Sequence, residues 1–217
     1  MTGLYDLHTH SILSDGEMLP IELVRRMAVT GYTTVAVTDH ADIANALSLI
    51  KPLLTLRNSA EKFGVTLLCG IEITHVPPGE IAIIAKRAKN AGADIVLVHG
   101  ETPVEPVAPG TNQAACSCDD VDVLAHPGLI LPEEADEARG RGIALEITSR
   151  AGHNRANGHV AAVARAAKCA LVVNSDTHAP GDILGEQARY LVARGSGLND
   201  RESRKVLDLN IEKLLAR

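Results

Sequence analysis

The stretch TVAVTDH, residues 34–40, joins a short apolar run to a carboxylate and an imidazole. Val35, Ala36 and Val37 are apolar without alternation, which is typical of a strand whose two faces are both buried. Such strands belong to parallel sheets, whose crossover connections are mostly helices. The stretch therefore predicts an α/β fold in which His40 directly follows a buried strand.

The same pattern recurs along the chain on both sides of this stretch. Strands are predicted at 4–7, 34–38, 65–71, 94–98, 121–125, 143–147 and 170–175. Helices are predicted at 20–29, 43–63, 80–90, 132–141, 154–168 and 201–215. Seven strands in 217 residues leave about 31 residues per unit, the length of a strand with its crossover helix. We predict one domain over residues 1–217, built either as an open sheet or as a barrel.

Composition excludes several classes of protein. Hydrophobic residues make up 46% and charged residues 22%, as in globular domains. A net charge of −6 and 2% aromatic residues disfavour nucleic-acid binding through bulk charge or base stacking. No basic segment precedes an apolar one at the N-terminus, and no apolar run reaches the roughly 18 residues of a membrane helix. We expect a cytoplasmic protein without a membrane partner.

The cysteines and one long irregular stretch need separate interpretation. Four cysteines lack paired CxxC spacing and are interpreted as reduced thiols. Cys116 and Cys118 supply only half of a tetrahedral metal site, so metal binding there is disfavoured. Residues 103–118, rich in proline and glycine, are predicted to form an active-site loop.

Histidines are concentrated where the predicted strands end. Six of the nine follow a strand within three residues: His8, His10, His40, His99, His126 and His178. Glu72 and Asp176 share these positions, and the C-terminal ends of parallel strands meet at one face. Clustered buried carboxylates repel unless cations lie between them, so a multinuclear metal site is indicated. Nitrogen and oxygen ligands suit Zn²⁺, Mn²⁺ or Fe²⁺.

Individual histidines differ in how strongly they indicate a ligand. In His8-Thr9-His10, side chains two residues apart on a strand point the same way and can bind one ion. His75, His153 and His159 lie outside the pattern. We interpret these three as surface or loop residues.

The ordered set of motifs resembles one known family. The motifs are Asp6-Leu7-His8-Thr9-His10 with Asp15, Thr38-Asp39-His40, Gly70-Ile71-Glu72, His99, Ala125-His126-Pro127-Gly128 and Ser175-Asp176-Thr177-His178. In this order they look like the motifs of the polymerase-and-histidinol-phosphatase (PHP) family, over essentially the whole chain. The resemblance implies a distorted seven-stranded (β/α) TIM-like barrel, with three metal ions at the C-terminal mouth of the strands, that hydrolyses phosphate esters.

The resemblance also implies roles for individual residues. His8, His10, Glu72 and Asp176 would hold the first ion, Glu72, His99 and His126 the second, and Asp15, His40 and His178 the third. Asp6 and Asp39 would orient imidazoles. Catalysis would use a hydroxide formed between two ions, with Glu72, Asp176 and His178 as catalytic residues. Either the third ion or His178 would serve the leaving group.

The substrate is less closely defined by the sequence. Arg150, Asn154 and Arg155 follow the sixth strand and are candidates to bind phosphate, although either arginine can equally pair with a surface carboxylate. Histidinol phosphatases often carry a basic residue after the last motif, where this chain has Ala179. We predict a phosphatase for a small phosphate monoester, histidinol phosphate or a similar metabolite. The alternatives are a 3′–5′ exonuclease or phosphodiesterase, and a module that binds without cutting.

Overall fold

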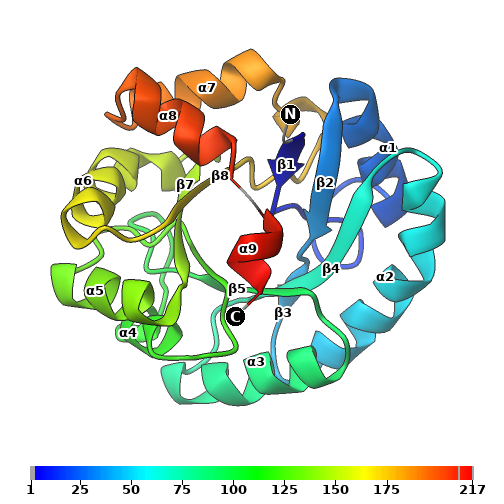
Figure 1. The fold of residues 1–217 in the computed structure, drawn as a ribbon. Coiled ribbons are helices and arrows are strands. Elements are labelled where there is room, and N and C mark those ends of the chain that lie inside the picture. Colours follow the sequence, from blue (N-terminus) through cyan, green and yellow to red (C-terminus); the bar gives the residue numbers. More distant parts are fainter. Residues whose placement is uncertain (1–2, 210, 217) are drawn as a thin grey trace.

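Seven parallel strands form a ring with helices on its outside (Figure 1). The computed structural model describes residues 3–209 and 211–216. In sheet order the strands are β1 (Leu4–Asp6), β2 (Tyr32–Val37), β4 (Thr66–Ile73), β5 (Ile95–His99), β6 (Val123–Ala125), β7 (Ala144–Thr148) and β8 (Leu171–Asn174). Short β3 (His40–Ala41) continues the pairing of β2 along β4. The sheet curves almost into a closed ring, which confirms the predicted distorted barrel.

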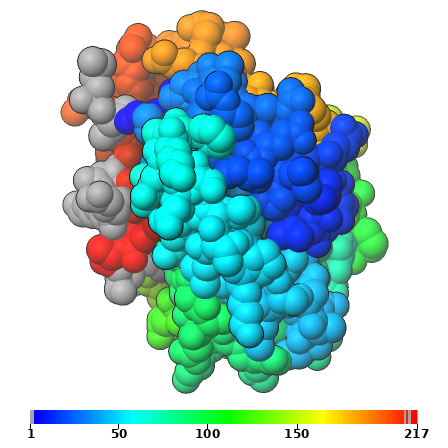
Figure 2. Space-filling model, turned by 90° about the vertical axis from the view of Figure 1, so that its right-hand side faces the viewer, coloured from blue at the N-terminus to red at the C-terminus, as the bar shows by residue number. Residues whose placement is uncertain are grey.

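Helices pack around the barrel after most of the strands. They are α1 (Pro20–Thr30), α2 (Ala46–Glu61), α3 (Ile81–Asn90), α4 (Thr111–Cys116), α5 (Pro132–Arg141), α6 (Asn157–Ala167), α7 (Glu186–Gly195), α8 (Asp200–Leu207) and α9 (Ile211–Leu215). Figure 2 shows the face, blue to cyan, that α1 and α2 cover side by side. Among the described residues, no helix is long and apolar enough to cross a membrane.

The apolar core has an inner and an outer layer. The strands turn alternate side chains into the barrel, where Leu7, Leu97 and Val172 pack together. Opposite side chains, such as Val96 and Leu145, pack under the helices. Short α9 crosses one opening of the ring in Figure 1, and its Leu214 joins the inner layer. That opening is therefore covered, and the functional residues lie at the other end.

The barrel is completed across a seam between β1 and β8 where side chains replace the regular ladder. Asn174 Oδ1 accepts the backbone N–H of Leu7 (3.0 Å), and Asp6 Oδ2 accepts that of Ser175 (3.1 Å). Beyond them, the N–H of His10 donates to the Thr177 carbonyl (2.8 Å). Buried polar side chains thus join the first strand to the last.

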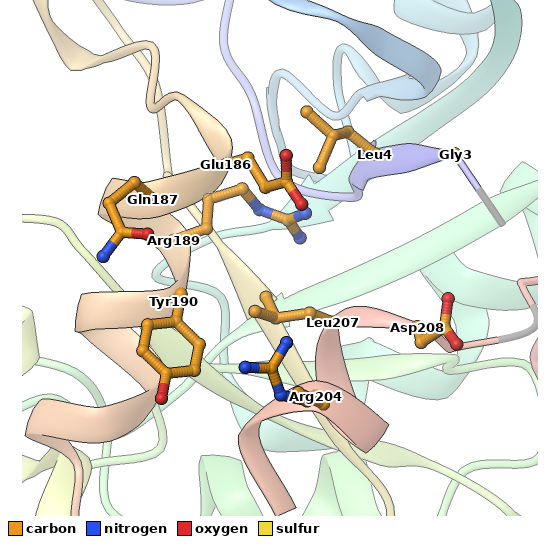
Figure 3. A pocket seen from close by; sticks show the side chains of 9 residues that line it. All are labelled: Gly3, Leu4, Glu186, Gln187, Arg189, Tyr190, Arg204, Leu207 and Asp208. Atoms are coloured by element: carbon orange, nitrogen blue, oxygen red, sulfur yellow. The ribbon is translucent and has the colours of Figure 1, made fainter. Parts of the chain in front are cut away.

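Arg189 of α7 fills the other end of this seam. It is 1% exposed, its guanidinium lies 4.4 Å from the Tyr5 ring centre, and Nη2 donates to the Val173 carbonyl (2.8 Å). Its positive charge opposes the effect of burial, which raises the pKa of Asp6 to about 6. Arg189 also lines a cavity of about 540 Å³, together with Leu4 at the start of β1 and Tyr190 (Figure 3).

The predicted elements are confirmed with several corrections. All seven strands are present, but β3 was not predicted. Residues 103–118 are not wholly irregular, because α4 forms within them. The predicted helix 201–215 is two helices, since α9 turns under the barrel to bury Leu214. The missed α7 buries Arg189 and Ala193, so its buried face lacks an apolar pattern.

Replacement of Arg189 tests whether it stabilises the seam. We expect Arg189→Met to lower the free energy of unfolding by about 3 kcal/mol, because the Val173 carbonyl loses its donor and Asp6 loses the opposing charge. Urea unfolding at a fixed concentration of divalent ion measures this. The exposed Arg201→Met is the control, with an expected change within about 0.5 kcal/mol. A loss in Arg189→Met no larger than in the control would contradict the role.

Candidate metal centre

The side chains predicted as metal ligands meet at the C-terminal end of the strands. They lie on β3, near the ends of β4 and β5, and on the segments after β1, β6 and β8. They are His8, His10, Asp15, His40, Glu72, His99, His126, Asp176 and His178. Parallel strands deliver them to the same end because every strand runs the same way through the barrel. The structure therefore brings all nine residues together.

The deepest part of this group surrounds Glu72. His8 Nε2 lies 3.3 Å from Glu72 Oε1, and His10 Nε2 lies 3.6 Å from Glu72 Oε2. Asp176 Oδ1 is 3.3 Å from His10 Nε2 and 3.7 Å from His8 Nε2. These side chains are at most 4% exposed. Two carboxylates and two imidazoles thus converge without access to bulk water.

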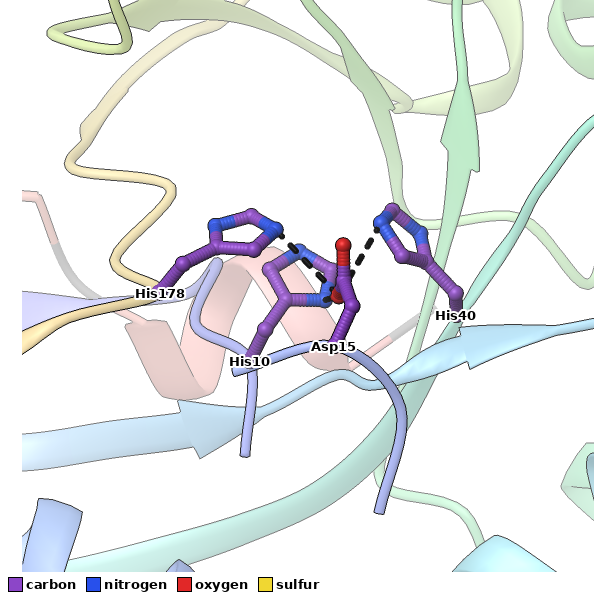
Figure 4. Close-up of side chains that lie close together, drawn as sticks. All are labelled: His10, Asp15, His40 and His178. Carbon is purple, nitrogen blue, oxygen red and sulfur yellow. Dashed lines mark ion pairs between the residues drawn. The ribbon is translucent and has the colours of Figure 1, made fainter. Parts of the chain in front are cut away.

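A second part lies nearer the surface around Asp15 (Figure 4). Asp15 Oδ1 is 3.4 Å from His178 Nε2, 3.5 Å from His40 Nε2 and 4.0 Å from His10 Nδ1. The Asp15 side chain is 57% exposed. His10 touches both parts, so they form one continuous cluster.

The third part contains a residue that the sequence analysis misplaced. His99 and His126 lie with ring centres 4.4 Å apart, and His153 lies 4.3 Å from His126. His153 was predicted to be a surface or loop residue. It does lie on the connection after β7, but it is buried, so it is not a surface residue. It follows β7 by five residues, outside the three-residue window that singled out the others. His75 and His159 are exposed, as expected.

The group that orients the imidazoles is also different from the one predicted. Asp6 and Asp39 accept backbone and hydroxyl hydrogens, among them the N–H of His8 and the N–H of Ser11, so their prediction as imidazole-orienting groups is wrong. Glu146 instead accepts from His8 Nδ1 (2.8 Å) and from the N–H of His126 (2.9 Å). The sequence analysis did not single out Glu146; a carboxylate within the buried strand 144–148 is the signal that could have indicated it.

The comparison with known proteins identifies the family of this chain. A model of the PHP domain family matches residues 6–211. The chain belongs to the PHP family. It is a metal-dependent phosphoesterase, as its family and a relative named as a probable phosphatase indicate.

Two relatives match the PHP chain along most of its length. It is 44% identical over 215 residues to an uncharacterized protein of Methanocaldococcus jannaschii, covering 98% of this chain and 99% of that one. It is 30% identical over 199 residues to a protein of Shewanella piezotolerans named as a probable phosphatase, covering 82% of this chain and 79% of that one.

Two solved structures share its fold at 15% sequence identity. A chain in archaeal ribonuclease P with mature tRNA has a TM-score of 0.73, covering 98% of this chain and 90% of that one. Histidinol phosphate phosphatase of Lactococcus lactis, complexed with zinc, L-histidinol and phosphate, has a TM-score of 0.62, with 90% and 94% covered.

The donor set of this PHP domain fits divalent cations. Most buried polar side-chain atoms without a hydrogen-bond partner, among the residues described, belong to the deep cluster: His8 Nε2, both ring nitrogens of His10, both oxygens of Glu72, His126 Nδ1 and Asp176 Oδ1. Burial raises the pKa of Glu72, but the charges of His8 and His99 outweigh it and hold that pKa well below its usual value. Ionised carboxylates with open lone pairs are metal ligands.

Two of the residues stand in strained backbone positions. The φ angle is +55° at Asp176 and +27° at His126, in the left-handed region that side chains rarely adopt. Gly128, two residues after His126, has φ +61°, and a Cβ there would collide with the Glu101 carbonyl. Such strain persists where the surrounding structure overdetermines it, which is typical of functional sites.

The three predicted phosphate-binding residues do not lie together. Arg150 lines a small cavity of about 70 Å³ with Asp176 and His178, and its Nη1 is 3.4 Å from Asp182 Oδ2. Asn154 and Arg155 are exposed on the 3₁₀ turn and are not among the residues that line this cavity. Only Arg150 therefore has a position from which it reaches the cluster.

The pairing of His40 generates a pH-dependent prediction for metal-free protein. Burial lowers the pKa of His40, but the neighbouring carboxylates of Asp15 and Glu72 outweigh it and raise that pKa to about 10. Because the folded pKa lies above the ordinary value near 6.5, the pair stabilises fully below about pH 6.5. This stabilisation is lost as pH rises through about 10.

Replacement of His40 measures this contribution. After chelator treatment we expect His40→Gln to lower the free energy of unfolding by about 1–2 kcal/mol at about pH 6, and by much less near pH 10.5. Urea unfolding at both pH values is the measurement. His159→Gln, at an exposed histidine outside the cluster, is the control and should show no such pH dependence. An equal loss at both pH values for His40→Gln would contradict the assignment.

Proposed function

We propose that this PHP domain hydrolyses a small phosphate monoester, histidinol phosphate or a similar metabolite, with three divalent ions at the barrel mouth. The convergence of nine nitrogen and oxygen ligands around unpartnered buried atoms carries the proposal. Unpaired buried carboxylates are costly, so the cluster is hard to explain without cations. Zn²⁺, Mn²⁺ and Fe²⁺ all suit this ligand set.

The ligands divide into three sets in this proposal. The first ion takes His8, His10, Glu72 and Asp176, and the second takes His99 and His126 with Glu72 bridging to the first. The third takes Asp15, His40 and His178. Short distances within each set support the division, including 3.4 Å between His126 Nε2 and Glu72 Oε1.

The ions would supply Lewis-acid charge for the phosphate oxygens and an activated water. The chain's own residues orient the ligands and bind the substrate. Glu146 holds the His8 ring through Nδ1, which leaves Nε2 facing Glu72 and Asp176. Arg150 is placed to bind a phosphate oxygen once it leaves Asp182. The leaving oxygen would be served either by the third ion or by a proton from His178. These are alternatives, because a His178 Nε2 that binds the ion carries no proton.

The shape of the mouth favours a small substrate. The cavity at Arg150 adjoins a wider hollow of about 530 Å³, and Asp15, His40, His99 and Glu105 line both. Among the described residues that line these two spaces, Arg150 is the single arginine or lysine. One arginine suffices for one phosphate, whereas a nucleic-acid backbone needs several cations in a row. The histidinol phosphate phosphatase that shares the fold binds phosphate and a small alcohol.

A second candidate is a 3′–5′ exonuclease or phosphodiesterase. The chain is 26% identical over 194 residues to the DNA polymerase/3′–5′ exonuclease PolX of Bacillus subtilis, covering 80% of this chain and 34% of that one. The solved chain with the TM-score of 0.73 comes from ribonuclease P bound to tRNA. The net charge of −6 and the scarcity of aromatic residues oppose nucleic-acid binding by this chain. We therefore rank the monoesterase first.

A panel of substrates separates the two candidates. The protein is loaded with Mn²⁺ or Zn²⁺ and given phosphate monoesters, including L-histidinol phosphate and nucleotides, together with a phosphodiester and short oligonucleotides. We expect phosphate release from at least one monoester. In Asp176→Asn we expect kcat/KM to fall at least about a thousandfold, and Asn is chosen because it tolerates the positive φ at this position. Activity that remains in this variant would reveal a contaminating phosphatase. Cleavage of oligonucleotides alone would overturn the monoesterase.

Two arginines on the same segment form a matched pair for testing substrate binding. We expect Arg150→Met to raise KM for the monoester at least about tenfold, because a charge-assisted hydrogen bond to phosphate is lost. Arg155→Met should leave KM within about twofold, since Arg155 does not line the cavity. Steady-state kinetics give both values. Equal changes of KM in the two variants would show that Arg150 does not bind the phosphate.

A further inference from the structure

Glu105 and His153 lie against the third part of the cluster, although neither belongs to the nine predicted ligands. We propose that both are additional ligands of the second ion, alongside His99, His126 and Glu72. The proposal rests on the proposed function, because it assumes that an ion binds at His99 and His126. It assigns a metal-binding role to the loop 100–110, which carries Glu105.

The distances place the Glu105 carboxylate between imidazoles. Its Oε2 lies 3.0 Å from His99 Nε2, and its Oε1 lies 3.4 Å from His153 Nε2. One nitrogen from each of His99, His126 and His153 falls within 4.8 Å of the others. Both carboxylate oxygens and several ring nitrogens thus converge on a small volume.

The hydrogen bonds of the rings indicate what lies in that volume. His99 Nδ1 is 3.3 Å from the Gly100 carbonyl, so Nδ1 carries the proton and a neutral ring has a lone pair on Nε2. That lone pair faces a carboxylate oxygen, and two acceptors at 3.0 Å require a proton or a cation between them. His153 uses Nδ1 on the Thr102 hydroxyl (2.8 Å), which leaves its Nε2 toward Glu105.

A metal ion satisfies these groups better than protons do. Protonation of all three rings would place like charges side by side, with ring centres 4.3–5.7 Å apart. A single divalent ion instead accepts the lone pairs of the rings and balances the carboxylate charge. With Glu105 and His153 the second ion would have five protein ligands, which leaves one position of an octahedral ion such as Mn²⁺ for water.

The loop holds Glu105 in this position through its own hydrogen bonds. Glu101 Oε1 accepts the N–H groups of Gly110 and Asn112, both at 3.0 Å, which joins the two ends of the loop. Asn112 Nδ2 also donates to the Pro127 carbonyl (2.8 Å). Pro103, Pro106 and Pro109 restrict the backbone between these ends. Glu105 therefore reaches the cluster from a stiff loop rather than from a mobile one.

Metal binding by the full chain tests the proposal without depending on activity. Chelator-treated and dialysed protein is titrated with MnCl₂ in a calorimeter, and bound manganese is counted after equilibrium gel filtration. We expect three ions per wild-type chain. Glu105→Gln and His153→Gln should each weaken one of the three sites at least about tenfold. Glu105→Asp, which keeps the charge but shortens the side chain, should weaken the same site.

The controls separate ligation from charge and from damage to the fold. Glu133→Gln removes the same charge from an exposed position on α5, and His159→Gln removes an exposed ring outside the cluster. Both should keep all affinities within about twofold. Unchanged manganese affinity in Glu105→Gln and His153→Gln, full affinity in Glu105→Asp, or an equal loss in His159→Gln would each overturn the proposal. Monoester hydrolysis by wild type would then leave the proposed function standing, whereas no manganese binding by wild type would overturn both.

Discussion

Negative charge buried at the barrel mouth is the constraint on which the rest of the site depends. Glu72, Glu146 and Asp176 are almost fully buried around His8. Glu146 is satisfied by the His8 ring, a backbone N–H and the Asn174 amide. The oxygens of Glu72 and Asp176 Oδ1 lack such partners, so their charge needs cations. The two kinds of carboxylate thus differ: Glu146 orients a ring, whereas Glu72 and Asp176 keep oxygens open for the proposed ions.

The cluster also lies across the seam of the barrel. His8 and His10 follow β1, while Asp176 and His178 follow β8, and these strands are joined by side chains and one bridge instead of a ladder. An ion held by His8, His10 and Asp176 would link the first strand to the last. Metal binding and closure of the barrel are then coupled, because the same ion contributes to both. At the opposite end Arg189 joins the seam without metal.

Most site residues near strand ends were predictable from the sequence, whereas His153 and Glu105 on longer loops and Glu146 within β7 were not. The sequence indicates two pairs of ligands by their spacing after an apolar run: His8 with His10, and Asp176 with His178. His153 lies beyond a glycine turn after β7, and only the fold of that turn brings it to 4.3 Å from His126. Glu105 reaches His99 because hydrogen bonds of Glu101 and Asn112 shape its loop. Neither position has a local signature.

By itself, the sequence determined the parallel α/β architecture and the side chains at the strand ends. Apolar runs without alternation demand burial on both faces, and strands that share a direction deliver their last residues to one end. Only the tertiary structure decided which carboxylates orient imidazole rings and which keep oxygens without a hydrogen-bond partner. It also decided that Arg150 rather than Arg155 faces the cluster, and that Glu105 and His153 lie against it. These outcomes depend on loop paths and on distances between residues remote in the chain, which local patterns do not encode.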